Sequence, residues 1–273
     1  MTFVGNIRKM KTALEGENAQ YTLPLHDILA AGETVFMNPL VGEKIRLSFD
    51  GEIHCVVTGK KIKKTFGEGM SFDAWRTHPS AAESIVRPEL SRIHEGIALR
   101  DFDWENEHHN QPHFVYLSNT SDIKVGVTRT INVPSRWIDQ GASEAIVVAE
   151  TPYRQLAGLM EVALKSHMAD KTNWRGMLTN TSAFSGSLLD IKEQVLEILS
   201  EEGFEDFFSD DDTITRIQYP VSHYPTKVTS MKLDTHSVIE GVLEGIRGQY
   251  LIFEGGKVLN LRSHAGYKVQ LEY

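Results

Sequence analysis

Five polar residues in the middle of the chain have the types needed to cut a phosphodiester bond: Tyr116, Lys124, Arg136, Glu161 and Asn173. A lone carboxylate such as Glu161 can hold one Mg²⁺ when water and phosphate complete its coordination shell. Arg136 can clamp the non-bridging phosphate oxygens in fork geometry. Tyr116 or Lys124 can act as general base if a metal and an arginine depress its pKa. Asn173 can orient the substrate.

The elements expected to position these residues follow a β-then-α order. Residues 114–117 form an apolar strand and residues 123–128 a second one, and the polar residues between them predict a hairpin. A helix begins at Pro134 or the next residue, because proline has no N–H to waste at the first helical position. A third strand at residues 145–149 and a long helix over residues 153–168 follow.

This order resembles the GIY-YIG nuclease superfamily, which includes repair nucleases, homing endonucleases and some restriction enzymes. Residues 114–116 stand in the place of GIY, and residues 124–126 in the place of YIG with lysine for tyrosine. Arg136 matches the arginine of the first helix, and Glu161 matches the glutamate of the second. The spacing of twelve from Glu161 to Asn173 is also preserved. The resemblance implies a Mg²⁺-dependent endonuclease module over about residues 113–178.

Longer strings resemble a bacterial family, the domain of unknown function numbered 2797. These strings are residues 112–117, 124–129, 134–142 and 170–175. The resemblance spans nearly the full length and implies no established activity. It also implies cysteines of a zinc knuckle ahead of the module, whose positions are occupied here by Ser71, Ala74, Ser84 and Ser91. The nearby histidines lack the spacing of a structural zinc site, so we do not expect zinc.

The whole chain is expected to be an α+β protein. An N-terminal β-rich domain covers residues 1–66, an irregular acidic segment 67–112, the GIY-YIG-like module 113–185, and a helix with a C-terminal β-rich domain 186–273. Asp50-Gly51 between alternating runs at residues 44–49 and 53–57 predicts a hairpin. The last region is expected to contain a helix at residues 188–200 and strands at residues 238–243, 250–253 and 258–261.

Composition limits the partners and the location of the chain. The net charge of −9 opposes general binding to nucleic acid, but ten acids lie between residues 190 and 212, and residues 59–64 are basic. DNA or RNA is therefore still the predicted partner. No apolar run approaches the roughly 18 residues of a membrane span, and the N-terminus lacks the layout of a signal peptide. Cys55 is the single cysteine, which excludes an intrachain disulfide, and we expect a cytoplasmic protein.

Each candidate residue also has a purely structural interpretation. Tyr116 can be a core residue, Lys124 a strand-edge residue, Arg136 and Glu161 an ion pair between helices, and Asn173 a helix cap. Three functions therefore remain open: a Mg²⁺-dependent phosphodiesterase, a non-catalytic nucleic-acid- or ribonucleoprotein-binding protein that keeps the module as a scaffold, and a protein-interaction module that uses the acidic segments. The sequence does not indicate an oligomeric state.

Overall fold

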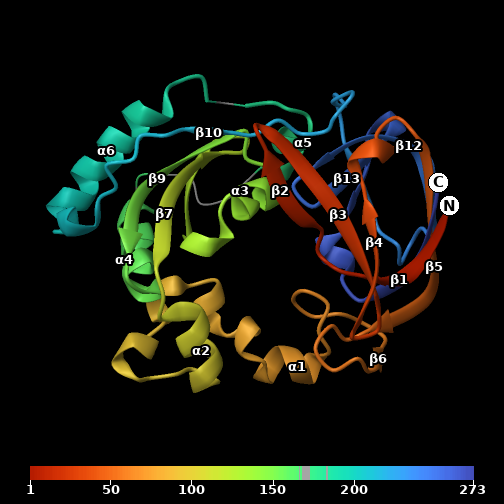
Figure 1. The fold of residues 1–273 in the computed structure, drawn as a ribbon, viewed down its shortest axis with the longest axis horizontal. Helices are drawn as coiled ribbons and strands as arrows, with labels where there is room; N and C mark the ends of the chain where they lie inside the picture. The colour runs from red at the N-terminus through yellow and green to blue at the C-terminus, as the bar shows by residue number, and fades with distance from the viewer. Residues whose placement is uncertain (166, 168–172, 183) are drawn as a thin grey trace.

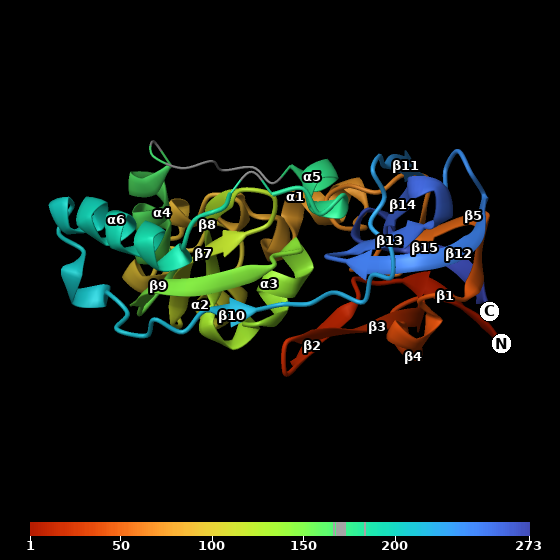
Figure 2. The same ribbon diagram turned by 90° about the horizontal axis from the view of Figure 1, so that it is seen from above.

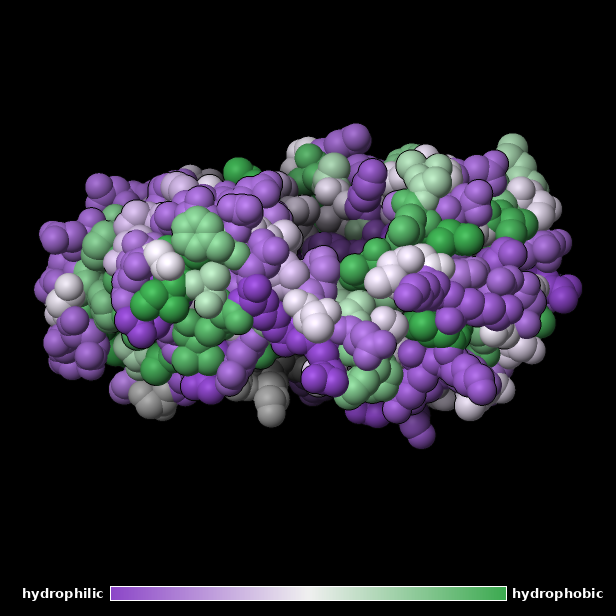
Figure 3. Space-filling model, turned by 90° about the horizontal axis from the view of Figure 1, so that it is seen from below, coloured by the Kyte–Doolittle hydropathy of each residue, from purple (hydrophilic) through white to green (hydrophobic). Residues whose placement is uncertain are grey.

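The computed structural model has two lobes, which lie side by side in Figures 1 and 2. It describes residues 1–165, 167, 173–182 and 184–273. One lobe is an eleven-stranded sheet, and the other is a four-stranded sheet with helices packed on it. The fold is α+β, as expected. Figure 3 shows a hollow between the two lobes and apolar patches separated by hydrophilic side chains on the face seen from below. Within the described ranges, no helix has the length and apolar character needed to cross a membrane.

The large sheet is built from both ends of the chain. Its strands are β1 (Thr2–Ile7), β2 (Lys11–Glu15), β3 (Asn18–Asp27), β4 (Ala30–Phe36), β5 (Lys44–His54), β6 (Lys61–Ile62), β11 (Thr229–Met231), β12 (Val238–Arg247), β13 (Tyr250–Phe253), β14 (Lys257–Asn260) and β15 (Tyr267–Glu272). Strand β15 pairs with β1 on one side and with β5 on the other, and β5 also pairs with β12. The two β-rich regions at the ends of the chain therefore share one sheet.

The hairpin predicted at Asp50-Gly51 is wrong. Strand β5 continues through both residues, and Gly51 takes a φ of +88° inside the strand. The register of β5 against β15 shifts between the pair Phe49–Val269 and the pair Ile53–Tyr267. An Asp-Gly pair suits a β-bulge as well as a turn, because glycine adopts a positive φ without steric cost. Here it bends one long strand.

The smaller lobe contains the strands β7 (His113–Asn119), β8 (Ile123–Arg129), β9 (Glu144–Thr151) and β10 (Thr215–Arg216). They lie in the order β10-β9-β7-β8, and the neighbours are antiparallel. The helices that follow are α3 (Ser135–Gln140), α4 (Arg154–Leu164), α5 (Trp174–Leu178) and α6 (Leu188–Glu201). The predicted β7–β8 hairpin and the predicted helices at α3, α4 and α6 are confirmed, as are the strands β9 and β12–β14. The helix predicted over residues 153–168 ends at Leu164, and residues 170–172 lie outside the described ranges.

The two faces of strand β7 have different neighbours because side chains alternate along a strand. Val115 and Leu117 join an apolar cluster with residues of α4 and α6. Tyr116 points to the other face and belongs to the cluster that includes α3 and the large sheet. The small sheet thus presents Tyr116 toward α3.

The residues between β6 and β7 form short helices that lead from the large sheet to the smaller lobe, with α1 nearer β6 and α2 below the smaller lobe (Figure 1). They are α1 (Phe72–Thr77), α2 (Phe102–His109) and the 3₁₀ turns η2 (Pro79–Ala81), η3 (Glu83–Ile85), η4 (Pro88–Leu90) and η5 (Ile93–Glu95). Helix α4 packs directly on η4, since a Cβ at Gly158 would collide with the backbone of Pro88 and Glu89. Arg154 donates hydrogen bonds to the carbonyls of Ser84 and Ile85, both at 2.9 Å. These contacts fix the segment beside α4.

Buried polar contacts join the two lobes. Asp139 of α3 accepts a hydrogen bond from Gln249 at 2.8 Å and forms an ion pair with Lys9. Arg247 of β12 is 2% exposed and donates to Gly141 O at 3.0 Å and to Asn180 Oδ1 at 2.9 Å. Removing the hydrogen-bond partners of buried charged groups such as Asp139 and Arg247 is destabilising, so these contacts hold α3 in a fixed position against the large sheet.

Candidate functional site

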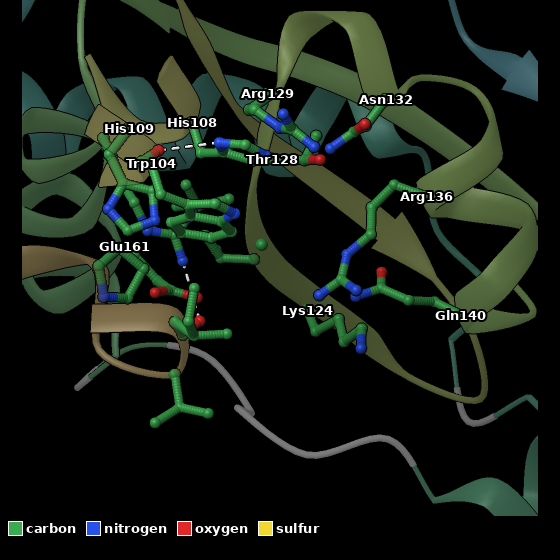
Figure 4. Close-up of a pocket in the computed structure, with 17 residues that line it drawn as sticks. Trp104, His108, His109, Lys124, Thr128, Arg129, Asn132, Arg136, Gln140 and Glu161 are labelled. Atoms are coloured by element: carbon green, nitrogen blue, oxygen red, sulfur yellow. Dashed lines mark hydrogen bonds between the residues drawn. The ribbon is translucent and has the colours of Figure 1, made fainter. Parts of the chain in front are cut away.

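A cavity of about 470 Å³ lies between β8, α3, α4 and the α2 segment (Figure 4). Three of the residues predicted from the sequence line it: Lys124 from β8, Arg136 from α3 and Glu161 from α4. We call it the central pocket. Figure 4 shows Lys124 and Arg136 on one side of the pocket and Glu161 on the other. The fold therefore brings Lys124 and Glu161 to one pocket although α3 and β9 lie between them in the sequence.

The central pocket is strongly cationic. Lys124, Arg129, Arg136 and Arg154 line it, and Glu161 is the only acid among the described lining residues. Burial lowers the pKa of Arg154 to about 10, which still leaves the guanidinium charged at neutral pH. Four cations around one carboxylate form an environment that attracts polyanions, and arginine forks suit phosphate oxygens. The pocket is therefore positively charged, although the net charge of the whole chain is −9.

Tyr116 lies beneath the pocket, fully buried, and its ring rests on the backbone of Gly126 in the paired strand. Its hydroxyl donates to Gln140 Oε1 at 2.8 Å, and the Arg136 guanidinium lies close enough to act on the charge of the phenol. Burial raises the pKa of Tyr116, and the attraction of Arg136 only partly opposes this rise. The tyrosine therefore holds its proton and positions Arg136 and Gln140 from below.

Glu161 is half-buried on the inner face of α4. Burial raises the pKa of this carboxyl, while Lys165 and Arg154 pull it down. No salt bridge joins Glu161 to Arg136 in the described part of the chain, so the ion pair considered as a structural alternative is not formed. A half-buried carboxylate that faces open space and several cations is a candidate ligand for a metal ion that accompanies an anionic substrate.

Asn173 lies away from these residues. It is exposed and caps α5, where its Oδ1 accepts a hydrogen bond from Gly176 N at 3.2 Å. It does not line the central pocket. The structure therefore places four of the five predicted residues in or directly beneath one pocket and the fifth at a helix end, which is the role considered as its structural alternative.

Several pocket residues were not singled out from the sequence. Arg154 is the first residue of α4, where a cation opposes the helix dipole. That unfavourable position is a signal that a second interaction holds the side chain, and the carbonyls of η3 supply it. Trp104 and His108 come from α2 and stack at 3.9 Å between ring centroids. No local pattern indicates them, because the docking of the segment brings them to the pocket.

Two buried histidines, His109 in the lining of the pocket and His113 outside the lining, are held neutral. His109 is buried, and its Nδ1 lies 3.1 Å from the hydroxyl of Ser91. Burial, with Arg154 as the next cause, lowers the pKa of His109 to about 3. Burial also lowers the pKa of His113 to about 4, although its hydrogen bond to Gln111 O opposes the shift. Neither ring adds charge to the pocket at neutral pH.

Metal ligands are sparse around the pocket. No group of three His, Cys, Asp or Glu side chains within the described ranges is arranged to hold a metal ion. Ser84 and Ser91, at two positions of the suggested zinc knuckle, are buried hydroxyls. Mg²⁺ needs fewer protein ligands, because it keeps several waters and is bound through one or two carboxylates plus substrate phosphates. The single carboxylate Glu161 fits that requirement.

Comparison with known proteins gives one match. A family model with the description "Protein of unknown function (DUF2797)" matches residues 42–269. No curated protein matches the chain, and no solved structure matches it. The matched range includes the central pocket, the α1–α2 segment and most of the large sheet.

Proposed function

The chain belongs to the family described as a protein of unknown function (DUF2797), and we propose that it hydrolyses phosphodiester bonds of nucleic acid in a GIY-YIG-like site that uses Mg²⁺. The observation that carries the proposal is the central pocket itself, which combines four cations with the single carboxylate of Glu161. A phosphodiester needs charge relief at its oxygens and a metal-bound or deprotonated water as nucleophile. The residue types in the pocket match both needs.

The order of elements around the pocket supports the same proposal. A hairpin, β7–β8, is followed by α3, then by the antiparallel strand β9, then by α4. Tyr116 and Gly126 face each other in that hairpin at the positions of the two tripeptides. Arg136 follows on the first helix and Glu161 on the second. This order of residues supports the proposal, which draws on the resemblance to GIY-YIG nucleases.

Each residue has a role in the proposed reaction. Arg136 binds the phosphate, and Tyr116 positions Arg136. Arg129 and Arg154 neutralise the remaining negative charge of the phosphate. Glu161 holds the ion; when bound, Mg²⁺ supplies positive charge to the phosphate and lowers the pKa of a water. Lys124 lines the pocket and can reach the substrate, whereas Tyr116 is buried and keeps its proton. The base proposed for the reaction is therefore Lys124 in its neutral form, while the three arginines carry the positive charge of the pocket and Tyr116 is a positioning residue.

The test is cleavage by the full chain of end-labelled DNA and RNA, single-stranded and duplex, with Mg²⁺ or with EDTA. We expect cleavage with Mg²⁺ alone and its loss in Glu161→Gln. The matched control is Glu150→Gln, an exposed carboxylate on β9 of the same lobe that does not line the pocket. Absence of cleavage on every substrate, or equal cleavage by Glu161→Gln, overturns the hydrolase proposal.

A second candidate is a protein that binds nucleic acid in the same pocket without cutting it. The observation in its favour is Tyr116, whose hydroxyl is committed to Gln140 and whose pKa is raised by burial. Binding of oligonucleotides that weakens in Arg136→Ala, together with no cleavage under any metal condition, would establish this candidate and exclude the first.

A further inference from the structure

An exposed group of aromatic rings lies at the start of the α1–α2 segment. Phe66, Phe72 and Trp75 contact one another, with ring centroids 5.2 to 6.2 Å apart, and we call them the aromatic platform. Phe72 is 47% exposed and Trp75 is 41% exposed. Large exposed apolar groups that are clustered mark interaction sites, whereas single ones need no explanation. We therefore expect this cluster to contact a binding partner.

Cations border the aromatic platform. Lys64 Nζ lies 5.5 Å from the centroid of Phe66, and Arg76 Cζ lies 5.7 Å from the centroid of Phe72. Between residues 60 and 76 the chain carries five Lys or Arg against two acids, Glu68 and Asp73. Glu68 is paired with Arg262. The platform is thus basic in a chain whose net charge is −9, and its charge complements a polyanion.

A cavity of about 510 Å³ opens beside Trp75, and its size falls within the ~300–1,000 Å³ of small-molecule sites. Its apolar walls are Met70, Trp75, Ala81, Ala82, Ile85 and Val86. Arg100 also lines it, and its guanidinium is anchored by hydrogen bonds to the carbonyls of Trp75 at 2.9 Å and His78 at 2.7 Å. Two acids, Glu68 and Glu83, also line the cavity, and each is paired with an arginine outside the lining. Apolar walls with a few polar groups suit an aromatic heterocycle.

This second cavity adjoins the central pocket. Ile85 and Val86 line both of them. Arg154, which lines the central pocket, donates to the carbonyl of Ile85 in the shared wall. One extended chain of nucleotides can therefore place a base at the platform and a phosphate among the cations of the central pocket.

The platform is held firmly by the end of the large sheet. The Cys55 thiol accepts hydrogen bonds from the backbone N–H of Ser71 at 3.1 Å and of Thr58 at 3.4 Å. Ser71 then caps α1 by accepting from Ala74 N at 3.2 Å. A side chain at Gly67, where φ is +54°, would approach the Trp75 ring at 3.1 Å. Preorganised rings lose little entropy when a partner stacks on them.

We propose that the aromatic platform and its cavity bind an unpaired base, so that the preferred ligand of the protein is single-stranded nucleic acid. The inference deepens the proposed function, on which its link to the central pocket rests. Bases stack on aromatic side chains while flanking cations follow the phosphates. A duplex cannot use the platform in this way, because its bases are already stacked within the helix.

The test is fluorescence anisotropy of the full chain in EDTA, so that binding is measured without cleavage. The probes are a single-stranded DNA and a single-stranded RNA of about 15 nucleotides and the matching DNA duplex. We expect the double variant Phe72→Ala, Trp75→Ala to bind the single strands about tenfold more weakly, while its duplex affinity stays unchanged. Phe36→Ala on β4, which removes another exposed ring (50%), is the matched control.

A charge variant tests the same surface independently. Lys64→Ala with Arg76→Ala should reduce the slope of log affinity against log salt by about 1.4 for single strands, at ~0.7 for each lost phosphate contact. The side chains removed in the two double variants are all exposed, so thermal melting should confirm that both variants fold. Equal single-strand affinity for the wild type and the aromatic variant overturns the platform proposal. So does concentration-dependent self-association that the aromatic variant abolishes while oligonucleotide binding is unchanged.

The two proposals fail in different ways. If the platform variants lose single-strand binding but no protein cleaves any substrate, the hydrolase proposal falls and the platform stands. If Mg²⁺-dependent cleavage is found and the platform variants bind and cut single strands like the wild type, the platform falls and the hydrolase stands.

Discussion

Gly126 lies directly opposite Tyr116 in the β7–β8 hairpin, and a Cβ at Gly126 would stand 2.5 Å from the phenol oxygen. Glycine is therefore needed at position 126 to leave room for the Tyr116 ring. It does not form a turn, since it lies within a strand. This pair lies directly beneath the central pocket, where the Tyr116 hydroxyl contacts Gln140 and lies close to Arg136.

Gly126→Ala should lower the free energy of unfolding by about 1–3 kcal/mol, the usual cost of forcing extra volume into a packed site. Chemical denaturation measures this loss. In a Tyr116→Leu background the same substitution should cost less than about 0.5 kcal/mol, because the ring that meets the new methyl group is gone. An equal cost in both backgrounds would show that the ring contact is not the reason for the glycine.

Arg136→Lys should reduce the rate of phosphodiester cleavage by about 10- to 100-fold although it keeps the charge. Lysine cannot form the fork that contacts phosphate oxygens and the Tyr116 hydroxyl together. The measurement is the initial rate with saturating Mg²⁺. Arg216→Lys on β10, an exposed position, is the control and should leave the rate unchanged. A fully active Arg136→Lys variant would contradict the phosphate role.

Asn173→Ala should change stability and leave chemistry intact. Loss of the cap on α5 should cost about 0.5–2 kcal/mol in the free energy of unfolding. The rate of cleavage should stay within about twofold of the wild type, since Asn173 does not line the pocket. Asn173→Asp retains the capping oxygen and should restore most of the stability. A large loss of cleavage activity in a stable Asn173→Asp protein would show that Asn173 takes part in the reaction.

Acid should destabilise the protein through His113. Burial holds the pKa of His113 at about 4, below its ordinary value near 6.5, so the unfolded chain binds the proton first as pH falls. Stability is therefore complete above about pH 6.5, falls below it, and levels off near pH 4. The loss at pH 5 should be about 2 kcal/mol from this residue.

The measurement is urea unfolding of the wild type and His113→Asn at pH 7.5 and pH 5. Asparagine retains an N–H for the carbonyl of Gln111 but does not titrate, so its stability should change less between the two values. His236→Asn, at an exposed position, should keep the wild-type difference. The same pH dependence in all three proteins would rule out His113 as the cause.

The local elements were largely predictable from the sequence. Short apolar, strand-like runs mark β7, β8 and β12, and the helical spacing of apolar residues marks α4 and α6, because each signal lies within a short window. The Asp50-Gly51 prediction failed for a physical reason: the same dipeptide serves a two-residue turn or a bulge, and only the pairing of β5 with β15 decides between them. Local sequence patterns also cannot predict that strands from the two ends of the chain pair in one sheet.

The site was predictable only in part. Lys124, Arg136 and Glu161 belong to one continuous β-then-α unit, so their order in the sequence indicates that they converge. Arg154 and Trp104 reach the same pocket through the docking of the α1–α2 segment, which depends on long-range contacts. The spacing of Asn173 after Glu161 is preserved, but its side chain is engaged at the end of α5.

The pairing of β1 with β15 also has a kinetic meaning. Contacts between distant parts of a chain form slowly, because loop closure precedes any gain from the contact. The β7–β8 hairpin and its helices depend on near neighbours in the sequence, whereas β1 must wait for the last strand. During synthesis the nascent chain can thus complete its pocket early and leave one edge of β1 and one edge of β5 unpaired until β15 emerges, which makes these two edges the part most exposed to misassembly.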